Sequence, residues 1–374
     1  MRIGIEAQRI FRKNKHGMDF VVLQEIKELQ KIDTKNEYFV FVAPGEDRCL
    51  EDTHNVHIME IGSNIYPIWE QSTLPHAAKE LDLDMLHCTS NTAPIHCDIP
   101  IILTLHDIIF LEPRSKFNLS IYQNLGWLYR RIVVRRILNK CMRIITVSEF
   151  ELDNIVSKLS IPRERMAMIY NGYTEWFKPA TESDFTFQKY IDSAGYFFFL
   201  GNTDPKKNTE RTLIAYAKYL EKSEFKRKLL LADLDRAYLS EILIRNHIEH
   251  IRKMIVIPGY IVNQDLPNIY NNAFAFLYPS LRESFGIPLL EAMACGTPVI
   301  TSNTSSMPEI GGPNAILINP ENPDEITEKM LLLETDTEFY SRQEEIGLHQ
   351  AAQFSWQQTA EQLLSLYEEV YREL

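Results

Sequence analysis

Short apolar runs alternate along the chain with longer stretches in which apolar residues recur at helical spacing. The short runs predict buried strands, and the periodic stretches predict amphipathic helices. Strands are predicted at 3–7, 37–43, 85–88, 100–105, 143–147, 196–201, 228–232, 254–259, 274–278 and 298–301. Helices are predicted between them, among others at 20–30, 209–220 and 234–249. This alternation indicates an α/β protein whose parallel sheets carry helices on both faces.

The alternation is interrupted by a loop that contains Asn171-Gly172 and Lys178-Pro179. The length of 374 residues also exceeds what one core usually organises. We therefore predict two doubly wound domains, the first over 1–180 and the second over 181–356. Ligands in such sheets bind outside the carboxyl ends of the strands, so the loops that follow strands are the first places to look for chemistry.

One of these loops lies within 278–309, where a strand is followed by a turn, a short helix and another strand. Gly286 lets the loop backbone approach a ligand closely, and Pro288 is expected as the first helical residue. The backbone NH groups of Phe285, Gly286 and Ile287 would then lie at a helix N-terminus. Such a terminus is suited to binding phosphate.

Two carboxylates flank this anion site. Glu283 lies in the loop before the helix, and Glu291 is expected in the first turn of the helix. Because a carboxylate repels phosphate, each is better suited to accept hydrogen bonds from hydroxyl groups, which a nucleotide sugar carries on both sides of its diphosphate. A second interpretation is that Glu291 complements the helix dipole and that Glu283 is solvated.

Two further loops also follow predicted strands. The loop 201–208 carries Lys206 and Lys207, whose positive charges can neutralise a diphosphate and stabilise the charge that grows as a sugar leaves. His106 and Asp107 end the strand at 100–105. Asp107 is a candidate orienting partner for the histidine.

Composition, charge and cysteine content exclude several classes of protein. Hydrophobic residues make up 45% and charged residues 24% of the chain, as in soluble globular proteins. The net charge of −12 argues against a general nucleic-acid binder. The five cysteines are scattered and include no CxxC pair, which favours reduced thiols in a cytoplasmic protein and suggests no zinc site. No apolar run approaches the ~18 residues that span a bilayer, and the start of the chain does not resemble a signal peptide.

The motifs resemble those of a known family, the retaining glycosyltransferases of family 4. Glu283-Ser284-Phe285-Gly286, with Glu291 further on, is similar to the family's donor-site signature, although the family usually has glycine in place of Ser284. Lys206-Lys207-Asn208 resembles the family's Arg-Lys-Asn loop, with a lysine in place of the usual arginine. Thr104-Leu105-His106-Asp107 resembles the segment that carries the family's donor-facing histidine.

The resemblance implies a GT-B fold, with two Rossmann-like domains that face each other across a cleft. It also implies that the last helix, 357–374, crosses back to the first domain. Donor binding belongs to the second domain and acceptor binding to the first. The implied catalytic residues are His106, Lys207 and Glu283. The implied donor-binding residues are Gly17, Lys206, Tyr260, Ile261, Ser284, Phe285, Gly286, Ile287 and Glu291.

Within that site the resemblance assigns separate roles. Glu283 contacts the transferred sugar and Glu291 the ribose, while backbone groups at Tyr260 and Ile261 line the base pocket. Gly17 resembles a glycine of the family's first loop, although a permissive turn explains it equally well. No metal or cofactor is expected, because lysines and helix NH groups already meet the phosphates. The carboxylate pairs Asp82/Asp84 and Asp233/Asp235 are the alternative that this expectation sets aside.

The predicted function is retaining transfer of a hexose from a nucleotide sugar to a glycan or lipid-linked glycan hydroxyl in surface-polysaccharide synthesis. GDP-mannose is the first choice of donor, by resemblance to bacterial mannosyltransferases. A UDP-glucose-type donor, a nucleotide-sugar epimerase and a non-catalytic sugar-nucleotide binder are the alternatives. An oxidoreductase is disfavoured because the first strand is not followed by a G-x-G-x-x-G turn.

Two regions of the first domain are candidates for other partners. The loops 63–73, with Tyr66 and Trp69, and 112–122 are candidates for stacking on an acceptor sugar, although Trp69 suits a core position equally well. The stretch 129–143 has six basic residues and no acid. It is either a packed helix with a solvated outer side or a face that binds the inner surface of a membrane and brings the enzyme to a lipid-linked acceptor.

Overall fold

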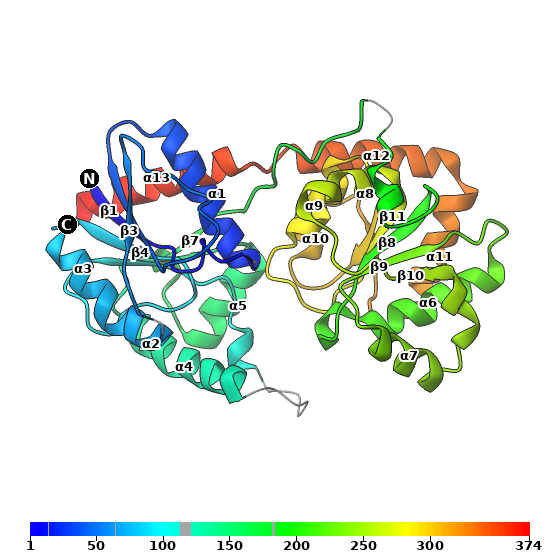
Figure 1. The fold of residues 1–374 in the computed structure, drawn as a ribbon, viewed down its shortest axis with the longest axis horizontal. Coiled ribbons are helices and arrows are strands. Elements are labelled where there is room, and N and C mark those ends of the chain that lie inside the picture. Colours follow the sequence, from blue (N-terminus) through cyan, green and yellow to red (C-terminus); the bar gives the residue numbers. More distant parts are fainter. Residues whose placement is uncertain (14, 64, 113–120, 182–183) are drawn as a thin grey trace. The chain divides into compact units, whose positions relative to one another are not determined.

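The computed structural model describes residues 1–13, 15–63, 65–112, 121–181 and 184–374 and divides into two compact units (Figure 1). Unit 1 comprises Met1–Gly172 and Trp356–Leu374, and unit 2 comprises Tyr173–Ser355. The boundary therefore lies a little before the position near residue 180 that the loop composition suggested. Each unit is an α/β layer structure with its own hydrophobic core.

Unit 1 is built on a seven-stranded parallel sheet of order β3-β2-β1-β4-β5-β6-β7. Its strands are β1 Arg2–Glu6, β2 Glu37–Val42, β3 Val56–Glu60, β4 Met85–Cys88, β5 Ile101–Thr104, β6 Arg143–Thr146 and β7 Met166–Met168. Its α-helices are α1 Gly17–Ile32, α2 Tyr66–Ile68, α3 Leu74–Glu80, α4 Ile121–Ile137, α5 Glu149–Leu159 and α13 Trp356–Glu373. Two buried apolar clusters pack against the sheet, and α1 and α13 contribute to one of them.

Unit 2 is built on a six-stranded parallel sheet of order β10-β9-β8-β11-β12-β13. Its strands are β8 Tyr196–Leu200, β9 Leu229–Ala232, β10 Ile255–Val256, β11 Ala273–Tyr278, β12 Val299–Ser302 and β13 Ile316–Ile318. Its α-helices are α6 Thr209–Lys222, α7 Arg236–Arg245, α8 Leu266–Asn272, α9 Ile287–Ala294, α10 Met307–Gly311, α11 Pro323–Thr335 and α12 Thr337–Ala351.

The apolar pattern missed three edge strands, and it overestimated a fourth. β3, β7 and β13 were not predicted, because β7 and β13 have three residues each and β3 is only partly buried. The expected strand at 254–259 shortens to β10. Met254 belongs to a preceding 3₁₀ turn, and Pro258 and Gly259, which has a φ of +80°, follow the strand.

The last helix, α13, packs within unit 1, as the resemblance implied. Its residues Leu363, Tyr367 and Val370 are fully buried in the cluster that also holds α1. The Tyr367 hydroxyl lies 2.7 Å from Nδ1 of His87 on β4, and Trp356 packs edge-on against Phe20 of α1. Figure 1 shows the chain leaving unit 2 at α12 and ending on unit 1. Within the described residues, no helix combines the length and apolar character that crossing a membrane requires.

Candidate active site

Two loops at the carboxyl edge of the unit 2 sheet form the candidate donor site. β8 and β11 are neighbours in the sheet, so the loop 201–208 after β8 and the loop 279–286 after β11 begin side by side. The backbone NH of Leu281 donates to the carbonyl of Lys206 at 2.7 Å, and Nδ2 of Asn208 donates to the carbonyl of Pro279 at 3.0 Å. The two motifs that the sequence separates are thus one structural unit.

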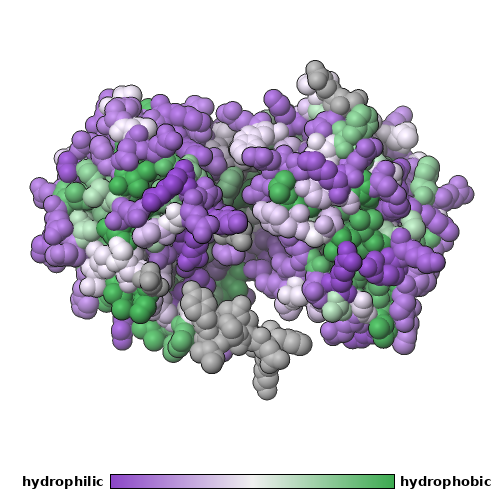
Figure 2. Space-filling model, viewed as in Figure 1, coloured by the Kyte–Doolittle hydropathy of each residue, from purple (hydrophilic) through white to green (hydrophobic). Residues whose placement is uncertain are grey.

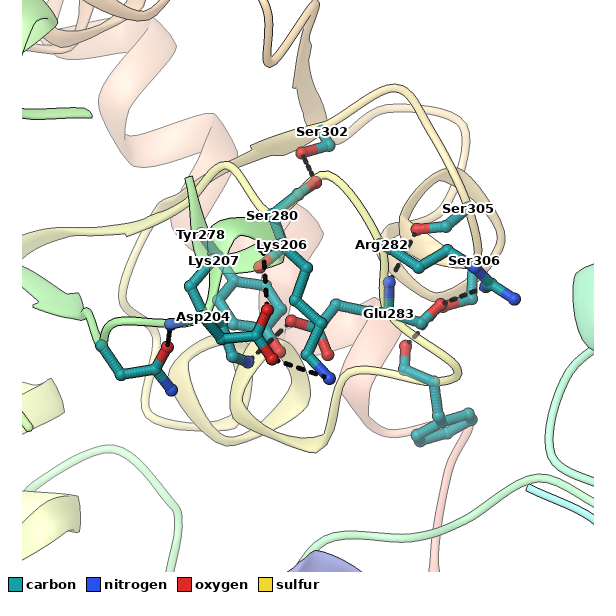
Figure 3. A network of polar contacts seen from close by, with 12 residues as sticks. Asp204, Lys206, Lys207, Tyr278, Ser280, Arg282, Glu283, Ser302, Ser305 and Ser306 are labelled. Carbon is teal, nitrogen blue, oxygen red and sulfur yellow. Dashed lines mark hydrogen bonds and ion pairs between the residues drawn. The ribbon is translucent and has the colours of Figure 1, made fainter. Parts of the chain in front are cut away.

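Lys207 and Glu283 form an ion pair where these loops meet (Figure 3). The distance from Lys207 Nζ to Glu283 Oε1 is 2.7 Å, and the side chains are only 19% and 14% exposed. The same ammonium lies 5.3 Å from the ring centre of Tyr278, a cation–π distance. The interpretation that Glu283 is solvated is therefore wrong.

Lys206 is held less firmly than its neighbour. Its Nζ lies 3.5 Å from a carboxylate oxygen of Asp204, and its side chain is 37% exposed. Asp204 also accepts a hydrogen bond from the backbone NH of Lys206 at 3.1 Å, which fixes the start of the short 3₁₀ turn that carries both lysines. The two ammonium groups consequently lie on one loop, with one anchored and the other more exposed.

Three serines at the end of β12 and in the loop after it hold the backbone of the glutamate loop, a role that was not predicted from the sequence. The Ser306 hydroxyl donates to the carbonyls of Glu283 and Phe285 at 3.0 Å each. Ser305 Oγ accepts from the NH of Glu283 at 3.2 Å, and Ser302 donates to the carbonyl of Ser280. Figure 3 shows these serines beside the loop. The sequence signal for this role was the run of small hydroxyl residues within 302–306, at the end of a strand.

Gly286 is favoured at the start of α9 by its backbone conformation, and a side chain there would also displace Met307. Its φ is +107°, which L side chains rarely adopt, and a Cβ there would lie 2.6 Å from the terminal methyl carbon of Met307. Phe285 before it is buried, whereas Ser284 and Ile287 on either side of this pair are half-buried. The helix begins at Ile287, so Pro288 is its second residue and not its first.

This start moves Glu291 out of the first turn, so the position predicted from the sequence is wrong. The first turn of α9 carries no acidic residue, so the dipole explanation for Glu291 fails as well, because that effect fades beyond the first turn. Burial raises the pKa of Glu291 to about 7, against the lowering effect of a hydrogen bond from Tyr270. The Tyr270 hydroxyl lies 3.4 Å from Oε2 of Glu291. Glu291 is thus a half-buried residue whose carboxyl group is close to its protonation midpoint at neutral pH.

The predicted base-pocket residues follow β10. Gly259 has a left-handed backbone, Tyr260 is 70% exposed and Ile261 is 5% exposed. Because the Ile261 side chain is buried within the protein, only its backbone groups are free to read the edge of a base. The role of both residues stays a prediction.

His106 lies in unit 1, at the carboxyl end of β5, and is 6% exposed. Its backbone NH donates to Oδ1 of Asn91 at 2.7 Å, and its Nε2 lies 3.0 Å from the carbonyl oxygen of Thr89. A carbonyl only accepts, so Nε2 carries the proton and Nδ1 of the neutral ring is an acceptor. Burial lowers the pKa of His106, while Thr89 and Asp107 raise it.

Two other candidates of unit 1, Trp69 and Gly17, differ from expectation, and a third lies outside the described residues. Trp69 is fully buried, and its Nε1 donates to the carbonyl of Ile61 at 3.0 Å, so it is a core residue and not a sugar-stacking one. Gly17 begins α1 without a left-handed φ, and a Cβ there would meet no atom within 4 Å. Its backbone therefore does not require glycine. Residues 113–120 of the second acceptor loop lie outside the described residues.

The carboxylate pairs that could suggest a metal have other roles. Asp84 accepts a hydrogen bond from the NH of Arg2, and Asp235 caps α7. Asp233 has a φ of +61°, the conformation for which glycine is usual, and burial raises its pKa while Lys207 lowers it. In the part of the chain that the structure describes, no three His, Cys, Asp or Glu side chains are grouped to hold a metal ion.

Two family models match the chain in succession. Residues 16–175 match the model described as glycosyltransferase family 4, and residues 182–350 match the model described as glycosyl transferases group 1. The chain belongs to the family 4 glycosyltransferases. The family 4 match falls almost wholly in unit 1, and the group 1 match falls in unit 2. The group 1 match contains both loops of the candidate donor site.

Similar proteins support the fold. The O-antigen chain mannosyltransferase B of Escherichia coli is 31% identical over 62% of this chain. The matched segment spans 61% of that protein's length. Sucrose-phosphate synthase from Thermosynechococcus elongatus superposes with a TM-score of 0.77 at 16% identity, covering both chains completely. Anabaena HepE, solved with UDP and glucose, superposes with a TM-score of 0.74 at 17% identity over 98% of this chain and 99% of its own. The GT-B fold predicted from the sequence is confirmed.

Proposed function

We propose that the protein transfers a hexose from a nucleotide sugar to a hydroxyl of a glycan or lipid-linked glycan, with retention of configuration and without a metal ion. GDP-mannose is the proposed donor and surface-polysaccharide assembly the proposed setting. The mannosyltransferase relative supports the sugar. A UDP-glucose-type donor is the alternative, because the structurally similar HepE was solved with UDP and glucose.

The observation that carries the proposal is the Lys207–Glu283 ion pair at the junction of two strand-end loops. It places a cation suited to phosphate beside a carboxylate suited to sugar hydroxyls. Lys206 on the same loop adds a second positive charge. In this assignment the lysines stabilise the departing diphosphate, Glu283 accepts hydrogen bonds from the sugar, and Glu291 accepts them from the ribose.

The direct test measures sugar transfer by Lys207→Ala and Glu283→Ala. Each variant is expected to lose about 100-fold or more in turnover, the scale of removing one charge-stabilising group. Lys218→Ala serves as a control, because it removes a lysine of a surface ion pair with Asp324 on the same unit, outside the two loops. Wild-type turnover in Lys207→Ala or Glu283→Ala would refute the site.

The donor and the metal requirement are tested separately. A thermal-shift panel with UDP, GDP, ADP and NAD is expected to show GDP as the best ligand, and a larger shift with UDP would favour the alternative donor. Activity is expected to survive EDTA. Loss of activity that only magnesium or manganese restores would refute metal independence.

We also propose that α4 rests on an anionic membrane surface that presents a lipid-linked acceptor. Leu125, Leu128 and Ile132 are 61%, 48% and 43% exposed and share one face of α4 by their spacing of three and four residues. The opposite face, with Val133, Val134 and Ile137, is buried. α4 is thus packed on one face, while its outer face carries exposed apolar side chains.

Charge supports the same partner. Arg135 and Arg136 are exposed beside the apolar face, in a chain of net charge −12. They belong to the six basic residues of 129–143, of which Arg143 is instead paired with Glu369 and Glu373. Figure 2 shows hydrophobic side chains at the lower margin of unit 1, where Figure 1 labels α2 and α4. Apolar side chains flanked by arginines suit a surface of anionic headgroups over acyl chains.

Flotation with vesicles that contain phosphatidylglycerol tests this surface. The wild type is expected to float at low salt, and the double variant Leu125→Gln/Leu128→Gln is expected to remain below. Ile244→Gln is the matched control, because Ile244 is equally exposed on unit 2, at 60%. A wild type that does not bind these vesicles would exclude the membrane contact.

A further inference from the structure

A group of buried polar residues at the carboxyl edge of the unit 1 sheet is not explained by the roles assigned so far. Glu6, at the end of β1, is 1% exposed, and Glu70, which follows α2, is fully buried. Arg9 lies with its guanidinium carbon 5.1 Å from the ring centre of Tyr66. The Tyr66 hydroxyl donates to Glu70 at 2.7 Å and lies 3.1 Å from the Thr92 hydroxyl. We call Glu6, Gln8, Arg9, Tyr66 and Glu70 the β1-edge cluster.

The members of this cluster lie close enough to influence one another. The pKa of Glu6 is raised chiefly by burial; Glu70 also raises it, and Arg9 lowers it. Burial raises the pKa of Tyr66 most; Glu70 and Glu6 raise it further, and Arg9 lowers it. Two buried carboxylates and the guanidinium of the half-buried Arg9 therefore lie close together. The salt bridges found among the described residues do not include Arg9.

Two atoms of the cluster lack partners. Nε of Arg9 and Oε1 of Gln8 are both buried and make no hydrogen bond within the described part of the chain. Gln8 is only 7% exposed. One of these atoms is a donor and the other an acceptor, and leaving such groups unsatisfied in a protein interior is costly. A hydroxyl group can both accept from a guanidinium and donate to an amide oxygen.

The cluster is continuous with the predicted catalytic histidine. Thr89 donates its hydroxyl to the carbonyl of Glu6 at 2.7 Å, and the carbonyl of Thr89 lies 3.0 Å from Nε2 of His106. β1 ends at Glu6, β4 ends just before Thr89 and β5 ends two residues before His106. These three strands are neighbours in the sheet. A ligand held at the cluster would thus lie at the same sheet edge as His106.

We propose that the β1-edge cluster is the acceptor subsite and that it binds a neutral, hydroxyl-rich sugar unit. This assignment rests on the proposed transferase function and adds the residues and the chemistry of the acceptor. Both carboxylates already accept hydrogen bonds within the protein, Glu6 from Gln8 and Thr89 and Glu70 from Tyr66, Thr92, Gln71 and Tyr129. The atoms left for a ligand are a donor, Nε of Arg9, and an acceptor, Oε1 of Gln8, and this combination suits a neutral hydroxyl group. A phosphate or a uronic acid would meet two buried carboxylates, which disfavours an anionic acceptor.

Binding of methyl α-D-mannopyranoside to the intact protein tests the subsite without donor or turnover. Saturation-transfer NMR is expected to detect the glycoside on the wild type and to show affinity lower by about tenfold in Arg9→Gln, the loss expected for one good hydrogen bond. Arg12→Gln is the matched control, because Arg12 is exposed three positions later. Inorganic phosphate is expected not to displace the glycoside.

Gln8→Met provides a second variant of nearly constant shape, in case Arg9→Gln unfolds. No glycoside binding by the wild type, equal binding by both cluster variants, or displacement by phosphate would each overturn the proposal. Nucleotide thermal shifts are expected to be the same in Arg9→Gln and the wild type. If the wild type bound no nucleotide but still bound the glycoside through Arg9, the transferase function would fail while the sugar site remained.

Discussion

Lys207 and Glu283 carry both a structural and a chemical role. Their side chains are mostly buried, so each charge depends on the other for compensation in the free protein. The same two groups are those suited to a diphosphate and a sugar. Substitutions at either position therefore change stability and activity together, and the two effects have to be separated.

A double-variant cycle separates them. Lys207→Ala and Glu283→Ala are each expected to lower the free energy of unfolding by about 1–3 kcal/mol, because each leaves a poorly solvated charge without its partner. The combined variant is expected to recover part of that loss but no transfer activity. Urea unfolding and turnover measure the two quantities, and additive stability losses would show that the pair contributes no coupling.

Glu291 predicts a pH dependence. Its pKa is about 7 in the folded protein and 4.5 ordinarily, so the folded state holds the proton more tightly than the unfolded chain. Its contribution to stability is therefore complete below pH 4.5 and is lost as the pH rises through about 7. Relative to Glu291→Gln, the wild type is expected to lose up to about 3 kcal/mol over this range. Parallel urea-unfolding profiles for the two proteins would contradict the assignment.

At the scale of elements, α13 completes a core that the rest of unit 1 leaves open. Leu363, Tyr367 and Val370 are fully buried against α1 and the sheet, and Tyr367 reaches His87 on β4. Arg143, at the start of β6, forms salt bridges to Glu369 and Glu373 on the same helix. The last helix is consequently part of the unit 1 fold although it follows the whole of unit 2.

Leu363→Ala tests this role. The cavity it leaves is expected to destabilise unit 1 by about 2–5 kcal/mol. Leu374→Ala makes the same substitution at a residue that is 57% exposed and is expected to have little effect. Chemical denaturation measures both, and equal stabilities would mean that α13 does not contribute to the core.

At the scale of the whole molecule, two separate cores predict two separable unfolding events. The two loops of the candidate donor site lie in unit 2, and the β1-edge cluster lies in unit 1. Ligands of the two kinds should therefore act on different transitions.

Calorimetry with nucleotide tests this division. GDP at a hundredfold excess over its Kd is expected to stabilise the unit 2 transition by about 2.7 kcal/mol and to leave the other unchanged. Leu363→Ala identifies the unit 1 transition by lowering it, and Lys207→Ala is expected to reduce the GDP shift. If GDP shifted only the transition that Leu363→Ala lowers, the nucleotide would bind unit 1, and the assignment of the donor site to unit 2 would be wrong.

The sequence by itself determined the alternation of strands and helices, the two sheets and the positions of Lys207, Glu283 and His106 at strand ends. These features follow from local periodicity, turn residues and motif spacing. It did not determine which strand-end loops meet. β8 and β11 are sheet neighbours, which joins residues 76 positions apart in the Lys207–Glu283 pair.

Only the tertiary structure decided the burial of Glu291 and Trp69, the exposed apolar face of α4 and the meeting of Glu6, Arg9 and Glu70. Each depends on which surfaces neighbouring elements cover. Apolar residues occupy both faces of α4, so periodicity could not show which face remains outside. Glutamate is usually exposed, so the sequence did not indicate that Glu6 and Glu70 are buried. Only the packing of β1 and of the segment after α2 showed their burial.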